Sequence, residues 1–204
     1  MTDPVLESPL VVIGGSPRRE LRVDGRGCLL AEQAFMDVLI LRGDAMDERF
    51  ALAVASATGL ALPMQANTAA VQDTRQLIWL GPDEWMLKDA GTEALAAGTG
   101  IDSRLATALR AVLSQYPGLH HSVVEVGSGY TTLSLQGPGA ADLLARGCPL
   151  DLHPRAFSAD AVAQSHVARA PVLIRCLRES GGFEVTVRRS FAAYLFHWLC
   201  EAGS

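Results

Sequence analysis

Charged side chains are scarce in this sequence, and lysine is almost absent. The 204 residues include 17 basic and 22 acidic ones, whereas an average domain of this length would carry about 51 charged residues. Lys88 is the single lysine. Either an alanine-rich composition accounts for this, or another chain covers part of the surface, because subunit interfaces are depleted in lysine but not in arginine. Composition leaves both explanations open.

The lack of a basic stripe and of a long apolar run argues against nucleic acid and membranes as partners. The formal net charge is −5, and the arginines are dispersed rather than grouped to neutralise phosphates. The longest nearly apolar stretch, Phe50–Pro63, is interrupted by polar residues and is too short to cross a bilayer. Residues 1–7 lack the cationic start of a secretory signal. We therefore expect a cytoplasmic protein.

Metal and nucleotide motifs are also missing. The four cysteines are far apart and form no C-x-x-C pair, which favours reduced thiols over disulfides or a zinc site: they are Cys28, Cys148, Cys176 and Cys200. His120 and His121 would point to opposite faces of a strand and could not easily share a metal ion. Gly127–Gly129 lacks the third glycine of a dinucleotide loop and precedes a strand. We expect this chain alone to bind no metal or cofactor.

Residues 1–33 are rich in turn formers, and we expect them to form an extended N-terminal arm. Beyond the arm, hydrophobic periodicity alternates between helical and strand spacing. Asp44 and Ser190 are the expected N-caps of the first and last helices. Helices are predicted at about 44–58, 101–116, 138–146 and 190–199, and strands at 35–41, 77–80, 85–88, 123–126, 130–135, 162–167, 172–177 and 183–187.

This order predicts an α+β fold with mainly antiparallel sheet. Residues 77–88 form one expected hairpin, and 123–135 form another around the glycines at 127 and 129. Each half of the remaining chain, about 34–126 and 127–204, has the order of a ferredoxin-like split β-α-β unit. We expect the two units to pack as one body, forming a single domain over 34–204.

The densest polar cluster, Gly147–Arg155, contains the candidate site residues. Cys148 follows the predicted end of a helix, where the dipole disfavours a thiolate, so an inert thiol is favoured over a nucleophile with His153 as base. In an extended segment, Asp151, His153 and Arg155 would share one side. They could then hold an anion or a partner's carboxylate, or form a self-satisfied Asp–Arg pair on a surface loop.

Several segments together resemble the gamma subunit of heterotetrameric sarcosine oxidase. They are Trp79–Trp85, Leu135–Pro138, Gly147–Pro154, Arg188–Phe191 and Trp198–Leu199. The resemblance spans about 34–199, and the string Gly-Cys-Pro-Leu-Asp-Leu-His-Pro is its most specific part. A looser similarity links the Gly-Pro element and its flanking strands to the folate-binding domain of aminomethyltransferases.

The resemblance implies a cytoplasmic flavoenzyme of four chains that oxidises the N-methyl group of sarcosine. The implied reaction yields glycine, hydrogen peroxide and, with tetrahydrofolate, methylenetetrahydrofolate. In that family the beta chain carries FAD and FMN, and the alpha chain carries NAD and the folate site. The gamma chain, bound to alpha, beta and delta, has a structural role. No family active-site residue maps to gamma.

We interpret residues 148–157 as a segment of the partner interface, through Cys148, Asp151, His153, Arg155 and Phe157. The sequence is also compatible with two other functions. One is a stand-alone folate-binding or one-carbon transfer protein, and the other is an α+β module that senses a small molecule.

Overall fold

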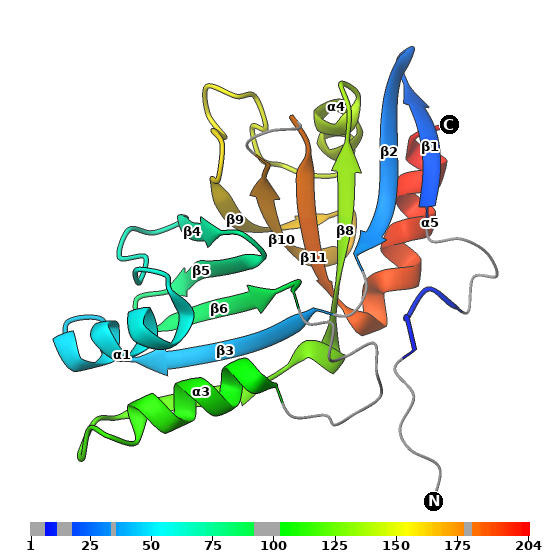
Figure 1. The fold of residues 1–204 in the computed structure, drawn as a ribbon. Coiled ribbons are helices and arrows are strands. Elements are labelled where there is room, and N and C mark those ends of the chain that lie inside the picture. The colour runs from blue at the N-terminus through cyan, green and yellow to red at the C-terminus, as the bar shows by residue number, and fades with distance from the viewer. Residues whose placement is uncertain (1–6, 12–17, 34–35, 92–102, 178–180) are drawn as a thin grey trace, which may run out of the picture. The chain divides into compact units, whose positions relative to one another are not determined.

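The computed structural model describes residues 7–11, 18–33, 36–91, 103–177 and 181–204, and the chain divides into two compact units (Figure 1). The first runs from Phe35 to Gly127, and the second combines Glu7–Ala34 with Ser128–Ser204. The rest of the predicted arm, the start of the strand expected from 35 and the start of the helix expected from 101 lie outside the described residues.

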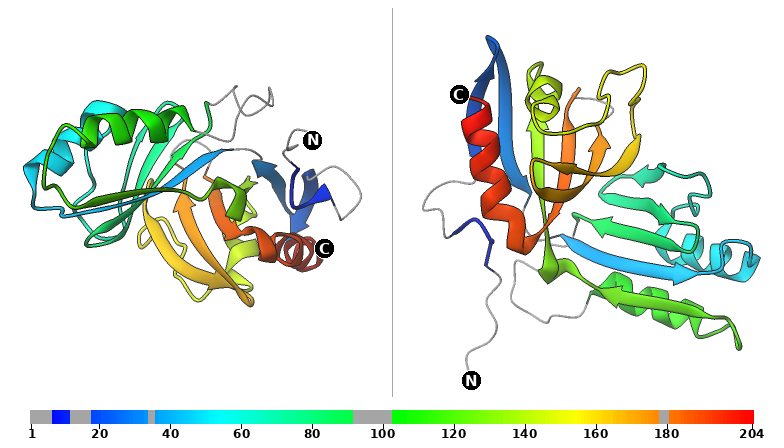
Figure 2. Two further views of the ribbon diagram at one scale, coloured as in Figure 1. Left: turned by 90° about the horizontal axis from the view of Figure 1, so that it is seen from below. Right: turned by 180° about the vertical axis from the view of Figure 1, so that it is seen from behind.

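The first unit is a five-stranded antiparallel sheet in the order β4-β5-β6-β3-β7. Its elements are β3 (Asp37–Gly43), α1 (Glu48–Thr58), β4 (Ala69–Gln72), β5 (Arg75–Gly81), β6 (Glu84–Asp89), α3 (Arg104–Leu113) and β7 (His121–Glu125). β6 lies between β3 and β5, and β3 lies between β6 and β7, which is the split β-α-β arrangement with β4 as an additional edge strand. Both helices lie on the same side of this sheet (Figure 2).

The core of the first unit forms between that sheet face and the two helices. Alternate residues of β3, β5 and β6 face α1 and α3, as the period of a strand requires. The largest of them is Trp85, which is fully buried, contacts the ring of Phe50 with centroids 5.7 Å apart, and donates its Nε1–H to the Pro63 carbonyl at 2.8 Å. The core also contains Leu39, Leu41, Val54, Leu77, Leu87, Leu105 and Leu109.

Helix α1 begins later than the sequence predicts. Asp47 is its N-cap and accepts the backbone N–H of Arg49 at 3.0 Å, whereas Asp44 accepts the N–H of Met46 in the preceding turn. The expected cap at Asp44 is therefore wrong, because two suitable aspartates are three residues apart and the first closes its own turn. The helix ends at Gly59, whose φ of 78° is the left-handed conformation of a C-cap.

The second unit is a six-stranded antiparallel sheet in the order β1-β2-β8-β11-β10-β9. Its elements are β1 (Arg18–Val23), β2 (Arg26–Gln33), β8 (Tyr130–Gln136), α4 (Ala140–Ala145), β9 (Val162–Val167), β10 (Ala170–Cys176), β11 (Phe183–Arg188) and α5 (Ala192–Ala202). Together the two units confirm the predicted α+β class with mainly antiparallel sheet. No helix among the described residues has the length and hydrophobicity needed to cross a bilayer.

The N-terminal residues that the sequence assigns to an arm are instead an integral part of the second unit. Residues 18–33 form the β1-β2 hairpin around Asp24 and Gly25, and β2 pairs with β8. Leu10 and Leu30 are buried in the core of this unit. β2 lies beside β8, which is the position of the fourth strand in a split β-α-β sheet.

Two further expectations at element boundaries are wrong. β7 and β8 do not form a hairpin, because β7 pairs with β3 in one sheet while β8 pairs with β2 and β11 in the other. Gly127–Gly129 is a 3₁₀ turn that leads the chain from one sheet to the next. Ser190 lies in a second 3₁₀ turn, and α5 begins at Ala192 without a side-chain cap.

Candidate functional site

The segment 148–157 follows α4 and forms a turn rather than an extended strand. The His153 carbonyl accepts the backbone N–H groups of Ala156 at 2.8 Å and Phe157 at 2.9 Å. The alternation expected for an extended segment therefore does not apply. The structure nevertheless leaves the side chains of Asp151, His153 and Arg155 exposed.

Local hydrogen bonds set the orientation of these polar side chains. Asp151 Oδ1 accepts the His153 N–H at 3.0 Å, and the Arg155 N–H lies 3.2 Å from His153 Nδ1. Because Nδ1 accepts this bond, a neutral His153 ring carries its proton on Nε2. Within the described part of the chain, no ion pair joins Asp151 to Arg155. Both charges are thus accessible to another molecule.

Two apolar side chains fix this turn to the second unit. Leu152 and Phe157 are buried in its core, and the Phe157 ring stacks on Phe183 with centroids 6.4 Å apart and an interplanar angle of 25°. The exposed polar groups are therefore carried on a segment held at both ends.

Cys148 lies apart from the exposed polar groups. Its side chain belongs to the same core, its Sγ lies 3.8 Å from Ser165 Oγ, and its N–H donates to the Leu144 carbonyl at the end of α4. Its neighbour Gly147 has no room for a side chain, because a Cβ there would lie 2.5 Å from the Trp198 ring. The structure thus places Cys148 inside and His153 outside.

Three other thiols are held in the protonated form by their surroundings. Burial raises the pKa of Cys28, Cys176 and Cys200, and for Cys176 the nearby Asp160 carboxylate raises it further. A raised pKa lowers the fraction of nucleophilic thiolate at neutral pH.

A buried polar network, which the sequence analysis did not identify, closes one end of the first unit. Ser103, the N-cap of α3, donates its hydroxyl to Asp37 Oδ2 at 2.7 Å, and its N–H donates to Glu125 Oε2 at 3.1 Å. Glu125 pairs with Arg110 of α3 at 2.8 Å. The network thus ties α3 to β3 and β7.

The neighbouring carboxylate of Asp89 is paired more strongly. Arg75 lies 3.0 Å from it and also donates to the Thr58 carbonyl, while the Thr74 hydroxyl and the Gly91 N–H donate to Asp89 Oδ1. Burial by itself would raise the pKa of Asp89, but these hydrogen bonds and the Arg75 charge lower it. Asp89 is therefore ionised and structural.

Asp37 has the opposite shift. Burial raises the pKa of Asp37, the Ser103 hydrogen bond opposes this, and the charges of Asp89 and Glu125 raise it further. Asp37 and Asp89 are directly opposite each other on β3 and β6, which explains their repulsion.

The second unit contains a comparable ion-pair group. Arg175 lies 3.2 Å from both Asp160 and Glu184, and all three side chains are largely buried. These groups join adjacent strands of one sheet. In the described ranges, no group of three or more His, Cys, Asp or Glu side chains is arranged to hold a metal ion.

Exposed large apolar side chains occur in both units, and most of those in the described residues belong to the first. Met46, Leu52, Met64 and Val71 are all exposed, and all belong to the first unit. The signal for this surface is present in the sequence, since no residue from Phe50 to Gln72 is charged. From the sequence we predict a helix at about 44–58 over part of this stretch and reject Phe50–Pro63 as a membrane span, but we assign no interaction surface there.

Comparison with known proteins identifies a consistent set of relatives. The sarcosine oxidase, gamma subunit family matches residues 42–204. The sarcosine oxidase gamma subunit of Corynebacterium sp. strain U-96 is 35% identical over 181 residues, covering 88% of this chain and 80% of its own length. The subunit from an Arthrobacter species is 35% identical over 152 residues, covering 74% and 68%.

A solved structure agrees with these relatives. A chain of the heterotetrameric sarcosine oxidase from Corynebacterium sp. U-96, in complex with pyrrole 2-carboxylate, superimposes with a TM-score of 0.81 and 30% sequence identity. The match covers 97% of this chain and 94% of that one. It therefore includes the N-terminal hairpin as well as the range matched by the family.

Proposed function

The chain belongs to the sarcosine oxidase gamma subunit family, and we propose that it is a non-catalytic subunit that helps to assemble a heterotetrameric sarcosine oxidase. The observation that carries this proposal is the similarity of nearly the whole chain to one chain of such a complex.

In the proposed reaction, the complex removes two electrons from the N-methyl group of sarcosine and reduces oxygen to hydrogen peroxide. The methyl carbon passes to tetrahydrofolate as methylenetetrahydrofolate, which leaves glycine. We assign the FAD, FMN, NAD and folate sites to the alpha and beta partners, with delta as the remaining subunit. We also propose that the complex is cytoplasmic.

The roles of the buried polar groups support a structural function for this chain. Asp89 is bound to Arg75, and Arg175 is bound to Asp160 and Glu184. In each case the partners stand on different strands or on the turns beside them, so their charges stabilise the fold. The raised pKa values of three thiols also favour structural over nucleophilic cysteines.

The segment 148–157 fits a role in assembly. Its exposed groups, Asp151, His153 and Arg155, provide a carboxylate, an imidazole and a guanidinium on a turn fixed by Leu152 and Phe157. A fixed polar surface loses little conformational freedom on binding. We propose that this turn contacts another subunit.

The test compares three preparations: the isolated chain, the complete complex, and the other subunits expressed without this chain. Sarcosine-dependent formation of hydrogen peroxide is measured in each. We expect activity only where the other subunits are present, and a lower yield or a lower melting temperature when this chain is omitted.

Sarcosine turnover by the isolated chain would contradict a non-catalytic role. Calorimetric titration of the isolated chain with tetrahydrofolate tests the alternative of a stand-alone folate-binding protein. Micromolar or tighter binding without the other subunits would favour that alternative.

A further inference from the structure

One exposed surface of the first unit carries no charge over an unusual length of chain. It consists of Met46 and exposed residues between Phe50 and Gln72, and we call it the α1 surface: Leu52, Ser56, Gly59, Ala61, residues 64–67 and Gln72. A well-solvated protein surface is designed with charges on about 25–35% of its residues. Their complete absence from this run requires a physical explanation.

Helix α1 shows the effect most clearly. Its inner face buries Phe50, Val54 and Thr58, so helical spacing turns Leu52 and Ser56 outward. Leu52 is 63% exposed, and Met46, just before the helix, is 81% exposed. The outer face of a surface helix is normally polar and charged.

The chain after α1 returns to the end of the helix and extends the same surface. Arg75 donates to the Thr58 carbonyl at 3.0 Å, and Gln72 Oε1 lies 3.9 Å from the position of a Cβ on Gly59. The Pro63 carbonyl, next to the exposed Met64, is held by Trp85 Nε1. The α1 surface is therefore fixed in place by hydrogen bonds to the core.

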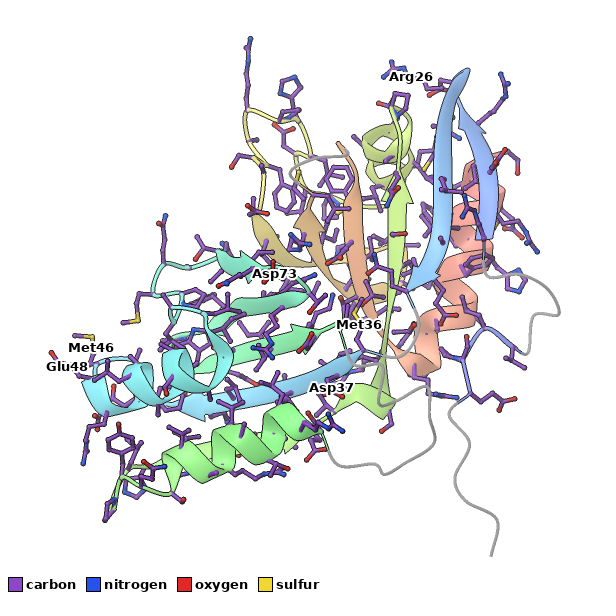
Figure 3. All side chains as sticks on the ribbon, in the orientation of Figure 1. Arg26, Met36, Asp37, Met46, Glu48 and Asp73 are labelled. Carbon is purple, nitrogen blue, oxygen red and sulfur yellow. The ribbon has the colours of Figure 1, made fainter. Side chains whose placement is uncertain are left out.

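Acidic side chains predominate around this surface, because the two arginines beside it, Arg49 and Arg75, are each paired with an aspartate. Asp44, Glu48 and Asp73 are exposed at its margins, and Met46 and Glu48 lie together at the outer end of α1 (Figure 3). Arg49 is neutralised by Asp47 at 2.6 Å. From Phe35 to Gly127 the chain has six basic and eleven acidic residues, a net charge of −5.

We propose that the α1 surface is the docking site for another subunit of the heterotetramer, whose matching surface has an apolar centre with arginine or lysine at its margin. This inference rests on the proposed function. Depletion of charge is typical of the centre of a protein interface. A second copy of this chain would bring acidic side chains together at the margin, which is unfavourable. An anionic membrane would be unfavourable for the same reason, because its charge is also negative.

The test co-expresses the tagged full-length chain with the other subunits of its complex and measures the amount of each that co-purifies. Leu52→Glu and Met64→Glu place a charge in the α1 surface. Val124→Glu is the matched control, because Val124 is 48% exposed on β7 of the same unit. We expect the first two variants to reduce co-purification at least about tenfold and the control to change it less than about twofold.

Each result separates the inference from the proposed function. The assignment to the α1 surface would be overturned if Leu52→Glu and Met64→Glu co-purified with the other subunits as well as wild type does. It would also be overturned if Val124→Glu reduced co-purification as much as they do. Failure of wild type to retain any subunit would contradict the proposed function. A wild-type dimer in sedimentation that Leu52→Glu converts to a monomer would identify a second copy as the occupant and overturn the proposal. Circular dichroism melts confirm that each variant is folded.

Discussion

Leu30 of β2 lies directly opposite Leu135 of β8, and both side chains are fully buried. The pair joins the N-terminal hairpin to a strand more than a hundred residues later in the sequence. Pairing with β2 gives hydrogen-bond partners to backbone N–H and C=O groups of β8 that would otherwise be unpaired at a sheet edge. The hairpin is thus a structural requirement of the second unit.

Leu30→Ala is expected to lower the free energy of unfolding by about 2–5 kcal/mol, since it removes a buried side chain and leaves a cavity. Urea unfolding of the isolated chain measures this change in the free energy of unfolding. Leu52→Ala is the control, because Leu52 is exposed and should change stability by less than about 0.5 kcal/mol. A cost at Leu30 as small as that of the control would mean that β2 does not pack in solution as the structure describes.

Gly137→Ala is expected to destabilise the same unit. Gly137 has a φ of 111°, and a Cβ there would lie 2.7 Å from the Gly27 carbonyl oxygen of the hairpin. Strain of this kind costs about 1–3 kcal/mol, which corresponds to several degrees in melting temperature. Gly129→Ala provides the control, because a Cβ there has nothing within 4 Å. Equal melting temperatures for the two variants would contradict the close approach.

The sequence predicts much of this fold because its periodic segments lie in regular elements. The strands expected at 162–167, 172–177 and 183–187 coincide closely with β9, β10 and β11. The hairpin at 18–33 was missed because Arg26–Gln33 does not alternate strictly between polar and apolar residues, and because its partner strand is distant. Local patterns contain no information about such pairing.

The candidate site was less accessible from sequence. The exposure of Asp151, His153 and Arg155 follows from their polarity, but their turn depends on hydrogen bonds to the His153 carbonyl and on the burial of Phe157. The Asp37–Ser103 contact joins residues 66 positions apart, and no spacing rule indicates it.

Asp37→Asn is expected to stabilise the chain at neutral pH relative to wild type. The pKa of Asp37 is raised in the folded state, so folding favours the protonated form. Its favourable contribution is complete below the unfolded pKa and is lost as the pH rises through the folded pKa. Asparagine resembles the neutral acid at every pH. Urea unfolding at pH 4 and pH 8 should show the variant's advantage only at the higher pH, and Glu20→Gln, at an exposed position, should show none.

Asp89→Asn should have the opposite effect. The pKa of Asp89 is lowered in the folded state, so its contribution is present above the unfolded pKa and is lost as the pH falls through the folded pKa. The variant is expected to lose about 1–3 kcal/mol at pH 7, because it weakens the bonds from Thr74, Arg75 and Gly91. The same urea series measures it. A larger loss at acidic pH than at pH 7 would contradict the assigned sign.

Arg155→Glu is expected to leave the isolated chain intact and to weaken assembly. The Arg155 side chain is exposed and only its backbone N–H is bonded, so stability should change by less than about 0.5 kcal/mol. If the turn contacts a partner, reversing this charge should raise the dissociation constant of the chain from its complex about tenfold or more, and raising the salt concentration should narrow the difference. Surface plasmon resonance with the immobilised partner subunits measures both effects. Arg104→Glu, an exposed arginine at the start of α3, is the control. Equal dissociation constants for the two variants would contradict a contact between residues 148–157 and a partner. That result would not test the α1 surface, which has its own variants.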